Sequence, residues 1–262
     1  MIVMVIYDTV ANQRTTYTRR ALASLHRTNL AKHRVFLVDN GSCQETKDLI
    51  APYGLYDGWN IITLPENIGT AEGWNMAAKL RAPGEHVIKI DNDIVINNCA
   101  DWIEQMEEVV RIDPKIGQVG LKRKDCIETT TNENPFYKSS IRQLPHIPGN
   151  RWIIVEQQFH VMGSCVLHSS DLLDSIGLMY QVGLYGFDDS ALSARCIKAG
   201  FMPVMLPHID IDHIDDGGNI YQKEKEALAN KVWQDGDYKR MLYEIGIGKY
   251  YYDGITHELR YP

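Results

Sequence analysis

The chain has 262 residues, of which 44% are hydrophobic and 23% are charged, as in ordinary soluble globular proteins. Its net charge of −7 argues against a surface built for nucleic acid, and no apolar run approaches the ~20 residues that cross a bilayer. The five cysteines include no C-x-x-C pair, which indicates reduced thiols, and the first residues lack the pattern of a signal peptide. We therefore expect a cytoplasmic protein.

Strand-like and helical segments alternate through the first hundred residues. Hydrophobic spacing predicts strands at 2–7, 34–38, 59–64 and 87–90, and helices at 18–28, 44–51 and 72–80. This order predicts a parallel, doubly wound sheet, in which ligands bind at the carboxyl ends of the strands. Acidic residues follow three of the strands at that edge: Asp8, Asp39, and the pair Asp91 and Asp93.

The second half of the chain is less regular. Its spacing predicts helices at 101–113 and 188–199, and strands at 153–161 and within 162–167. Residues 126–150 are rich in Thr, Asn, Pro and Ser, which predicts a long loop on the acceptor side. The last forty or so residues contain many Tyr, Lys and Glu, and we expect them to form helices packed over the domain.

Asp91 and Asp93 end an apolar run, with one residue between them. Two carboxylates held side by side in a low-dielectric place repel each other unless a cation binds there. Mg²⁺ and Mn²⁺ are held by one or two carboxylates and carry substrate phosphates on their open positions. The pair therefore predicts a metal site, with a solvated turn after the strand as the alternative interpretation.

Six basic residues and no acidic one occur in the segment 9–38. In a helix, Arg20 and Arg27 would share one face. A solvated helix face explains this pattern without any function. The alternative is a patch that contacts an anionic acceptor, an acidic membrane surface or nucleic acid.

Two segments have side chains or backbone groups suited to a nucleotide. Asp39 follows a strand, where a carboxylate can accept hydrogen bonds from a nucleobase N–H or a ribose hydroxyl. The turn 66–75 contains Asn67, Gly69 and Asn75 and leads into a predicted helix. Backbone N–H groups at such a helix start can face a diphosphate.

Two later segments carry ionisable groups. Asp188 and Asp189 open a predicted helix, where acidic side chains also compensate the helix dipole. His213 follows an apolar strand, and a lone histidine there is more often a packed or surface residue than a ligand.

Together and in this order, these segments resemble the GT-A nucleotide-sugar glycosyltransferases of the family-2-like group. The resemblance covers residues 1–220 and rests on V-D-N-G-S at 38–42, N-x-G-x-x-x-G-x-N at 67–75, D-x-D at 91–93, G-S-C at 163–165, and the segment from Asp188 and Asp189 to Ala199-Gly200-Phe201, followed by His213. It implies a GT-A (Rossmann-like) α/β domain with a mixed sheet flanked by helices. Its nucleotide-binding half would be 1–100, its acceptor-binding half 101–220, and a C-terminal helical extension would follow at 221–262.

The resemblance also implies a role for each matching residue. The donor would be bound by Asp39, Asn67, Gly69, Asn75 and Asp91, joined by Asp8 at the same edge of the sheet. Mn²⁺ or Mg²⁺ would be held by Asp91, Asp93 and His213. The general base that deprotonates the acceptor hydroxyl would be Asp189, with Asp188 as the alternative. Asp188 stands where the family often has Glu, and Ala191 where it often has a third acid, so the match at this helix start is incomplete.

The expected function is therefore a metal-dependent, inverting transfer of a sugar from a nucleotide-diphosphate sugar, most commonly a UDP-sugar, to an acceptor hydroxyl. The acceptor would be a glycan, a lipid-linked sugar or another hydroxyl compound, and contact with a membrane surface through 9–38 stays an option. The first alternative is a DNA-modifying glycosyltransferase acting on a hydroxymethylated base. The others are a non-catalytic nucleotide-sugar-binding module and a nucleotidyltransferase, for which the segment 8–14 lacks the expected Gly-rich signature.

Overall fold

The structure is a computed structural model that describes residues 1–97, 99–127, 140–146, 151–158, 160–181, 183–215, 220–234, 251–252 and 259–260. Its first half contains β1 (Ile2–Ile6), α1 (Thr15–Leu25), β2 (Val35–Asn40), α2 (Gln44–Ile50), the 3₁₀ helix η1 (Ala51–Leu55), β3 (Trp59–Leu64), α3 (Thr70–Ala78), β4 (Val87–Ile90) and β5 (Ile94–Val95). Then come α4 (Trp102–Ile112), β6 (Ile116–Arg123), α5 (Lys124–Ile127), β7 (Ser140–His146), β8 (Arg151–Gln157), β9 (Cys165–His168), α6 (Ser170–Ile176), α7 (Asp188–Lys198), β10 (Met202–His213), α8 (Ile220–Gln234), β11 (Tyr251–Tyr252) and β12 (Leu259–Arg260).

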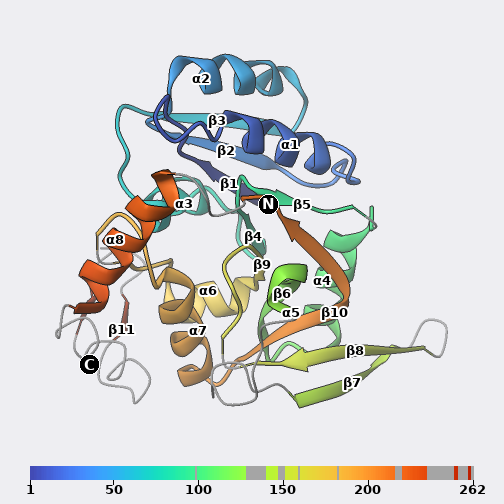
Figure 1. Ribbon diagram of the computed structural model, residues 1–262. Helices are drawn as coiled ribbons and strands as arrows, with labels where there is room; N and C mark the ends of the chain where they lie inside the picture. Colours follow the sequence, from blue (N-terminus) through green and yellow to red (C-terminus); the bar gives the residue numbers. More distant parts are fainter. Residues whose placement is uncertain are drawn as a thin grey trace.

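The main sheet has ten strands in the described part of the chain, in the order β3-β2-β1-β4-β9-β6-β10-β8-β7, with β5 beside β10 (Figure 1). The strands β1 to β4 are parallel, as the alternation of segments predicts. β9 runs antiparallel to both β4 and β6, so the whole sheet is mixed. The expected fold class, an α/β domain with a mixed sheet flanked by helices, is confirmed.

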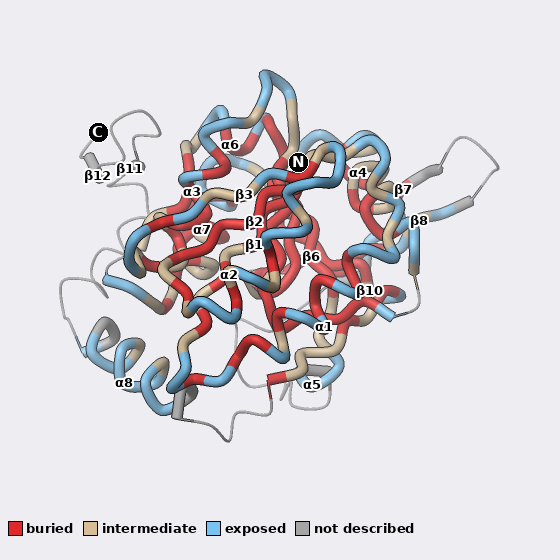
Figure 2. Tube along the Cα trace, turned by 90° about the horizontal axis from the view of Figure 1, so that it is seen from above, coloured by how far each residue is buried: buried red, intermediate tan, exposed pale blue. Residues whose placement is uncertain are grey.

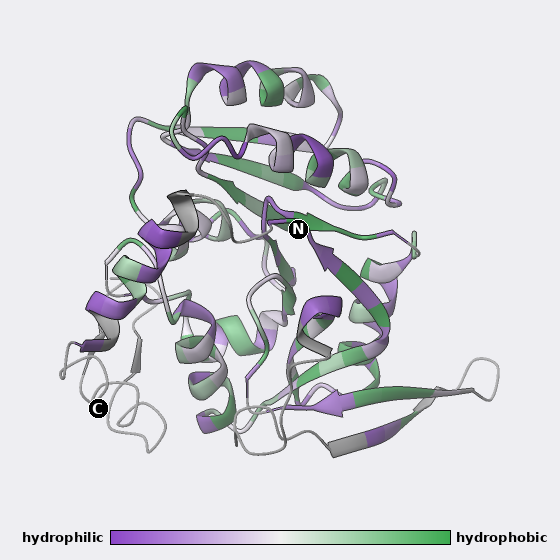
Figure 3. Cartoon of the chain, viewed as in Figure 1, coloured by the Kyte–Doolittle hydropathy of each residue, from purple (hydrophilic) through white to green (hydrophobic). Residues whose placement is uncertain are grey.

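Strand alternation divides the core into two layers. Ile2 and Met4 of β1 pack in the layer that contains α1 and α4, whereas Val3 packs in the layer that contains α3, α6 and α7. Successive side chains of a strand point to opposite faces, so a strand that is buried on both faces is apolar throughout. Figure 2 shows these strands buried at the centre, and Figure 3 shows the hydrophobic residues that run along β1 and β2.

Two predictions about the later segments are wrong in part. The composition of 126–150 predicts a loop, but the segment contains the end of α5 and the whole of β7. β7 pairs residue by residue with β8, from Ser140 opposite Gln157 to His146 opposite Arg151. Cross-strand pairing supplies the regularity there, which composition does not reveal. For the last forty or so residues the expectation is helices; α8 fits this, but β11 and β12 form a short antiparallel pair. Residues 128–139, 147–150, 235–250 and 253–258 lie outside the described ranges.

None of the helices in the described part of the chain has the length and apolar character that a membrane span requires.

Candidate active site

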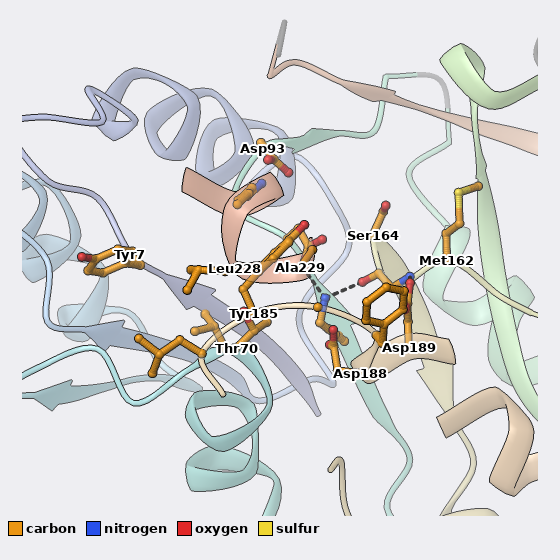
Figure 4. A pocket seen from close by; sticks show the side chains of 18 of the residues that line it. Tyr7, Thr70, Asp93, Met162, Ser164, Tyr185, Asp188, Asp189, Leu228 and Ala229 are labelled. Atoms are coloured by element: carbon orange, nitrogen blue, oxygen red, sulfur yellow. Dashed lines mark hydrogen bonds and ion pairs between the residues drawn. The ribbon is translucent and has the colours of Figure 1, made fainter. Parts of the chain in front are cut away.

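A cavity of about 940 Å³ lies where the ends of β1, β4 and β10 meet the start of α7 (Figure 4). Four structural segments supply most of its polar wall. The first is the end of β4 with the residues after it, the second is 160–164, the third is the start of α7, and the fourth is α8. Residues from both halves of the chain therefore face one volume, large enough for a substrate.

Strand pairing explains why the predicted residues meet here. β5 pairs with β10 so that His213 lies opposite Ile94, which follows Asp93 directly in the chain. β4 pairs with β9 so that Ile90 lies opposite Cys165, and the Asp91 N–H donates to the Ser164 carbonyl over 2.9 Å. The D-x-D segment is thus held between two strands from the second half of the chain.

Asp93 lies in a buried cluster of charges. Its Oδ2 accepts a hydrogen bond from Arg14 Nη2 at 2.5 Å and lies 3.4 Å from His213 Nε2. Against the effect of burial, the neighbouring His213 and Arg14 hold the pKa of Asp93 well below its usual range. Arg14 also forms an ion pair with Asp215, so this buried arginine joins the D-x-D segment to the residues that precede α8.

The other oxygen of Asp93, Oδ1, is buried and has no hydrogen-bond partner among the described residues. In the same ranges, no group of three or more His, Cys, Asp or Glu side chains is arranged to hold a metal ion. Mg²⁺ and Mn²⁺ do not need such a cage, because one or two protein ligands and the oxygens of a substrate suffice. Asp93 Oδ1 and His213 therefore fit a metal whose coordination a bound substrate would complete.

Asp91, like Asp93, is paired with a buried cation, although its side chain is 38% exposed. Its Oδ1 forms an ion pair with Lys89, and the Lys89 ammonium also donates to the Gly163 carbonyl over 2.6 Å. Lys89 lies on β4 and Asp91 follows the strand two residues later, so their side chains extend to the same side of the sheet and pair there. Opposite charges in such a poorly solvated place stabilise each other, and the Asp91 carboxylate, with those of Asp188 and Asp189, outweighs burial and raises the pKa of Lys89.

Asp188 and Asp189 line the cavity at the start of α7, but their surroundings differ. Burial, reinforced by the charges of Asp189 and Asp91, raises the pKa of Asp188 to about 6. The Asp189 carboxylate accepts hydrogen bonds from the N–H groups of Gly163 (3.1 Å) and Ser190 (2.7 Å). Against the effect of burial, the neighbouring His160 and the Gly163 N–H lower the pKa of Asp189, so the pKa values of these two adjacent acids move in opposite directions.

His160 is a neighbour of this pair that sequence reasoning missed. Its Nε2 lies 3.1 Å from Asp189 Oδ2 and 3.5 Å from Ser190 Oγ. Burial alone would lower the pKa of His160, but the neighbouring Asp189 carboxylate, together with the charge of Asp188, outweighs that effect and raises it. Nothing in the local pattern around residue 160 distinguishes this histidine from others in the sequence, and only the fold brings it to α7.

The turn before α3 does not offer its N–H groups to a ligand, contrary to expectation. The N–H of Gly69 donates to Asn67 Oδ1, that of Thr70 to the Leu184 carbonyl, and that of Ala71 to Gln181 Oε1. The helix start therefore holds Gln181 and Leu184 in place, and Leu184 lines the cavity. Asn67 itself lines the cavity, so a contact with the donor through its side chain stays a prediction.

Three predicted donor-binding residues lie behind the cavity wall. The Asp8 carboxylate is buried and accepts hydrogen bonds from Thr18 Oγ1 (2.6 Å) and Asn92 Nδ2 (2.9 Å), which ties β1 to α1. Asn75 is also buried, and its amide exchanges hydrogen bonds with both backbone groups of Met179. We therefore assign Asp8 and Asn75 a supporting role instead of the expected donor contact. Asp39 is buried too, but its Oδ2 has no partner in the described ranges.

The comparisons with known proteins agree with this geometry. Residues 2–166 match the family model described as glycosyl transferase family 2, which covers more than half of the chain. No curated protein matches the sequence.

Several solved structures share the fold. A mannosyltransferase from Pyrobaculum calidifontis, solved with GDP-Man and Mn²⁺, superposes with a TM-score of 0.63 at 17% identity, over 94% of this chain and 68% of that one. GalNAc-T7, solved with UDP, GalNAc and Mn²⁺, gives 0.60 at 15% identity, over 92% of this chain and 50% of that one. S. aureus TarS, solved with UDP-GlcNAc, gives 0.54 at 15% identity, over 94% of this chain and 70% of that one.

Proposed function

The chain belongs to glycosyl transferase family 2, and on that premise we propose that it transfers a sugar from a nucleotide-diphosphate sugar to an acceptor hydroxyl, with inversion and with a divalent metal. One observation carries the proposal: Asp93, with its unpartnered buried oxygen, and Asp189, at the start of α7, face the same cavity within the described part of the chain. A metal-binding carboxylate and a base separated by substrate-sized space are what such a transfer requires.

On the donor side, Asp93 Oδ1 and His213 are the proposed metal ligands, with Asp91 beside them. A bound Mn²⁺ or Mg²⁺ would supply positive charge where negative charge develops on the departing nucleoside diphosphate. Asp39, through its Oδ2, is the proposed contact to the nucleoside of the donor. Asn67, which lines the cavity, is a second proposed contact to the donor. Arg14 positions the Asp93 carboxylate through its hydrogen bond at 2.5 Å.

On the acceptor side, Asp189 is the proposed base. A general base must be accessible to the acceptor hydroxyl. We choose Asp189 because its side chain is 26% exposed, whereas the whole Asp188 residue is 9% exposed. Asp189 would take the proton as the hydroxyl oxygen attacks the anomeric carbon and the bond to the diphosphate breaks. His160, 3.1 Å away, would hold the carboxylate in place. A base on the acceptor suits a single displacement, which inverts the anomeric centre.

The donor nucleotide stays a proposal, and UDP-sugars are the first choice. The similar structures, by their names, were solved with either UDP-type or GDP-type ligands. At such low identity, these ligands guide which donors to test and do not decide between them.

The acceptor is proposed to be a hydroxyl on a glycan or a lipid-linked sugar, with an anionic surface engaged by α1. Of the six basic residues between 9 and 38, Arg14 is buried, and Arg34 pairs with Glu85. The other four are exposed, and among the described residues no acidic side chain pairs with them: Arg19, Arg20, Arg27 and Lys32. Such unpaired charges favour contact with anionic lipid headgroups.

The test is calorimetry of UDP- and GDP-sugars with Mn²⁺, using wild type, Asp93→Asn and an exposed control, Asp48→Asn. We expect one donor to bind wild type and the control only when Mn²⁺ is present, and to bind Asp93→Asn at least about tenfold more weakly. If wild type bound no nucleotide-sugar with or without Mn²⁺, the proposal would fail.

A further inference from the structure

Helix α8 forms part of the cavity although it lies outside the family match, which ends at residue 166. Four of its residues line the cavity: Glu224, Lys225, Leu228 and Ala229. The helix packs closely against the loop before α7, because a Cβ added to Gly186 would come within 3.4 Å of the Ala229 backbone. Figure 4 labels two of these cavity-lining residues, Leu228 and Ala229.

Lys225 carries a positive charge into the cavity close to the predicted metal ligands. Its side chain is only 14% exposed, and its Nζ lies 5.3 Å from the centre of the Tyr185 ring. Asp93, Asp91 and Asp215 all interact with it electrostatically, so the ammonium lies near the D-x-D segment. Removing an ammonium from water is costly unless anionic groups surround it.

Lys225 shares the Asp215 carboxylate with Arg14. Its Nζ lies 3.9 Å from Asp215 Oδ2, and Arg14 pairs with the same oxygen. Burial lowers the pKa of Lys225 despite the neighbouring carboxylates. Because Lys225 and Asp93 line the same cavity, a ligand with concentrated negative charge bound beside Asp93 would add a charge-assisted contact with this ammonium.

We propose that Lys225 binds the diphosphate of the donor and stabilises the nucleoside diphosphate as it leaves. This inference rests on the proposed function. It adds a protein cation to the charge that a metal would supply, and it makes α8 part of the donor site. When the anomeric carbon–oxygen bond breaks, the electron pair stays on the diphosphate oxygen, and Lys225 stabilises that added charge without being consumed.

The test compares the binding of UDP, GDP, UMP and GMP, in the presence of Mn²⁺, to four forms of the full chain. These are wild type, Lys225→Met, Lys225→Arg, and Lys231→Met, which removes an exposed charge from the same helix. We expect Lys225→Met to weaken binding of the preferred diphosphate about 10- to 100-fold, to change monophosphate binding much less, and to be largely restored by arginine. Lys231→Met should match wild type.

Hydrogen exchange of wild type gives a second measurement that does not depend on the stability of a variant. The preferred diphosphate should slow exchange in 220–234, and the monophosphate should slow it less. If wild type binds the diphosphate but Lys225→Met binds it equally well, or if exchange in α8 does not change, this inference is overturned while the proposed function stands. If wild type binds no nucleoside diphosphate at all, both are overturned.

Discussion

Asp188 and Asp189 are neighbours in sequence but differ in chemistry because their partners differ. Asp189 receives backbone N–H donors and lies beside His160, whereas Asp188 has a distant contact with Gln181 Nε2 at 3.5 Å. Donors that bind a carboxylate favour its charged form, and burial without them favours the neutral form. The pair is therefore expected to give different results when each member is replaced by asparagine.

Replacement of Asp189 tests the base. Asp189→Asn should lower kcat about 10²- to 10⁴-fold, because the amide cannot accept the acceptor proton. The KM for the donor should change little, since Asp189 is assigned to the acceptor side. Steady-state kinetics would measure both, with Asp48→Asn as the exposed control. Turnover near the wild-type rate would show that Asp189 is not the base.

Replacement of Asp188 tests the cost of burying its charge. The pKa of Asp188 is about 6 in the folded chain, against 3.8 ordinarily, so stability falls as the pH rises from 3.8 through 6. An asparagine side chain carries no charge, and we expect Asp188→Asn to be more stable than wild type by roughly 1–3 kcal/mol at neutral pH. Denaturant unfolding at several pH values checks this.

The gain should disappear at pH values below 3.8, where Asp188 is protonated in both states. A variant that is less stable than wild type at neutral pH would contradict the assignment of a destabilising buried carboxylate.

At this scale, sequence reasoning recognised the acidic residues but not their partners. Asp93, Asp189 and His213 line one cavity, and the roles assigned to them stay predictions. Arg14 and Lys225 were missed as cavity residues, because each is one basic residue among many and its position depends on distant pairing.

At the scale of elements, two glycines with positive φ lie in turns next to the parallel strands: Gly41 after β2 and Gly84 before β4. Gly41 follows β2 with a φ of +80°, and a Cβ there would lie 2.6 Å from the Glu66 carbonyl carbon. Gly84 has nearly the same φ, +77°, but a Cβ there would meet nothing within 4 Å. Alanine at Gly84 would therefore test the cost of the left-handed backbone alone, whereas alanine at Gly41 would add the cost of the close contact.

The prediction is a large difference between two alanine variants. Gly84→Ala should cost about 1 kcal/mol of unfolding free energy, from the left-handed conformation alone. Gly41→Ala should cost at least about 3 kcal/mol, because the backbone at Glu66 must also move. Urea denaturation measures both, and equal losses would show that the close approach at Gly41 does not matter.

The sequence predicts the strands of the first half well and those of the second half less completely. The strand bounds 59–64 and 87–90 are correct, because these apolar runs are flanked by turn residues. β6 was not predicted as a strand, and β10 was expected only as an apolar strand before His213, without bounds, although both lie in the second half of the sheet. The expected placement of the acidic residues at the carboxyl ends of the strands needed only the parallel order of the first half, so this gap did not affect it.

At the scale of the whole molecule, α1 presents unpaired basic charge at the surface of an otherwise acidic chain, as far as the described residues show. Arg19→Ser with Arg20→Ser should weaken co-sedimentation with anionic phospholipid vesicles, and added salt should weaken wild-type binding as well. Lys79→Ser with Lys231→Ser removes the same charge elsewhere and should have little effect. Equal binding by wild type and the α1 variant, or binding to duplex DNA but not to vesicles, would contradict the proposed contact with a membrane surface.

The two halves of the chain meet at the cavity, and this division matches the chemistry proposed for the enzyme. The parallel half brings the D-x-D segment, and the second half brings α7, the end of β10, and α8. The proposal that residues 1–220 form the transferase domain should therefore be extended to include α8.

The most direct test of the central claim is release of nucleoside diphosphate from a panel of nucleotide-sugars, with Mn²⁺ or Mg²⁺ and without added acceptor. Slow, metal-dependent hydrolysis of one donor by wild type, lost in Asp93→Asn and retained in Asp48→Asn, is the predicted result. Absence of both binding and hydrolysis with every donor, or hydrolysis that is unchanged in Asp93→Asn, would contradict the account.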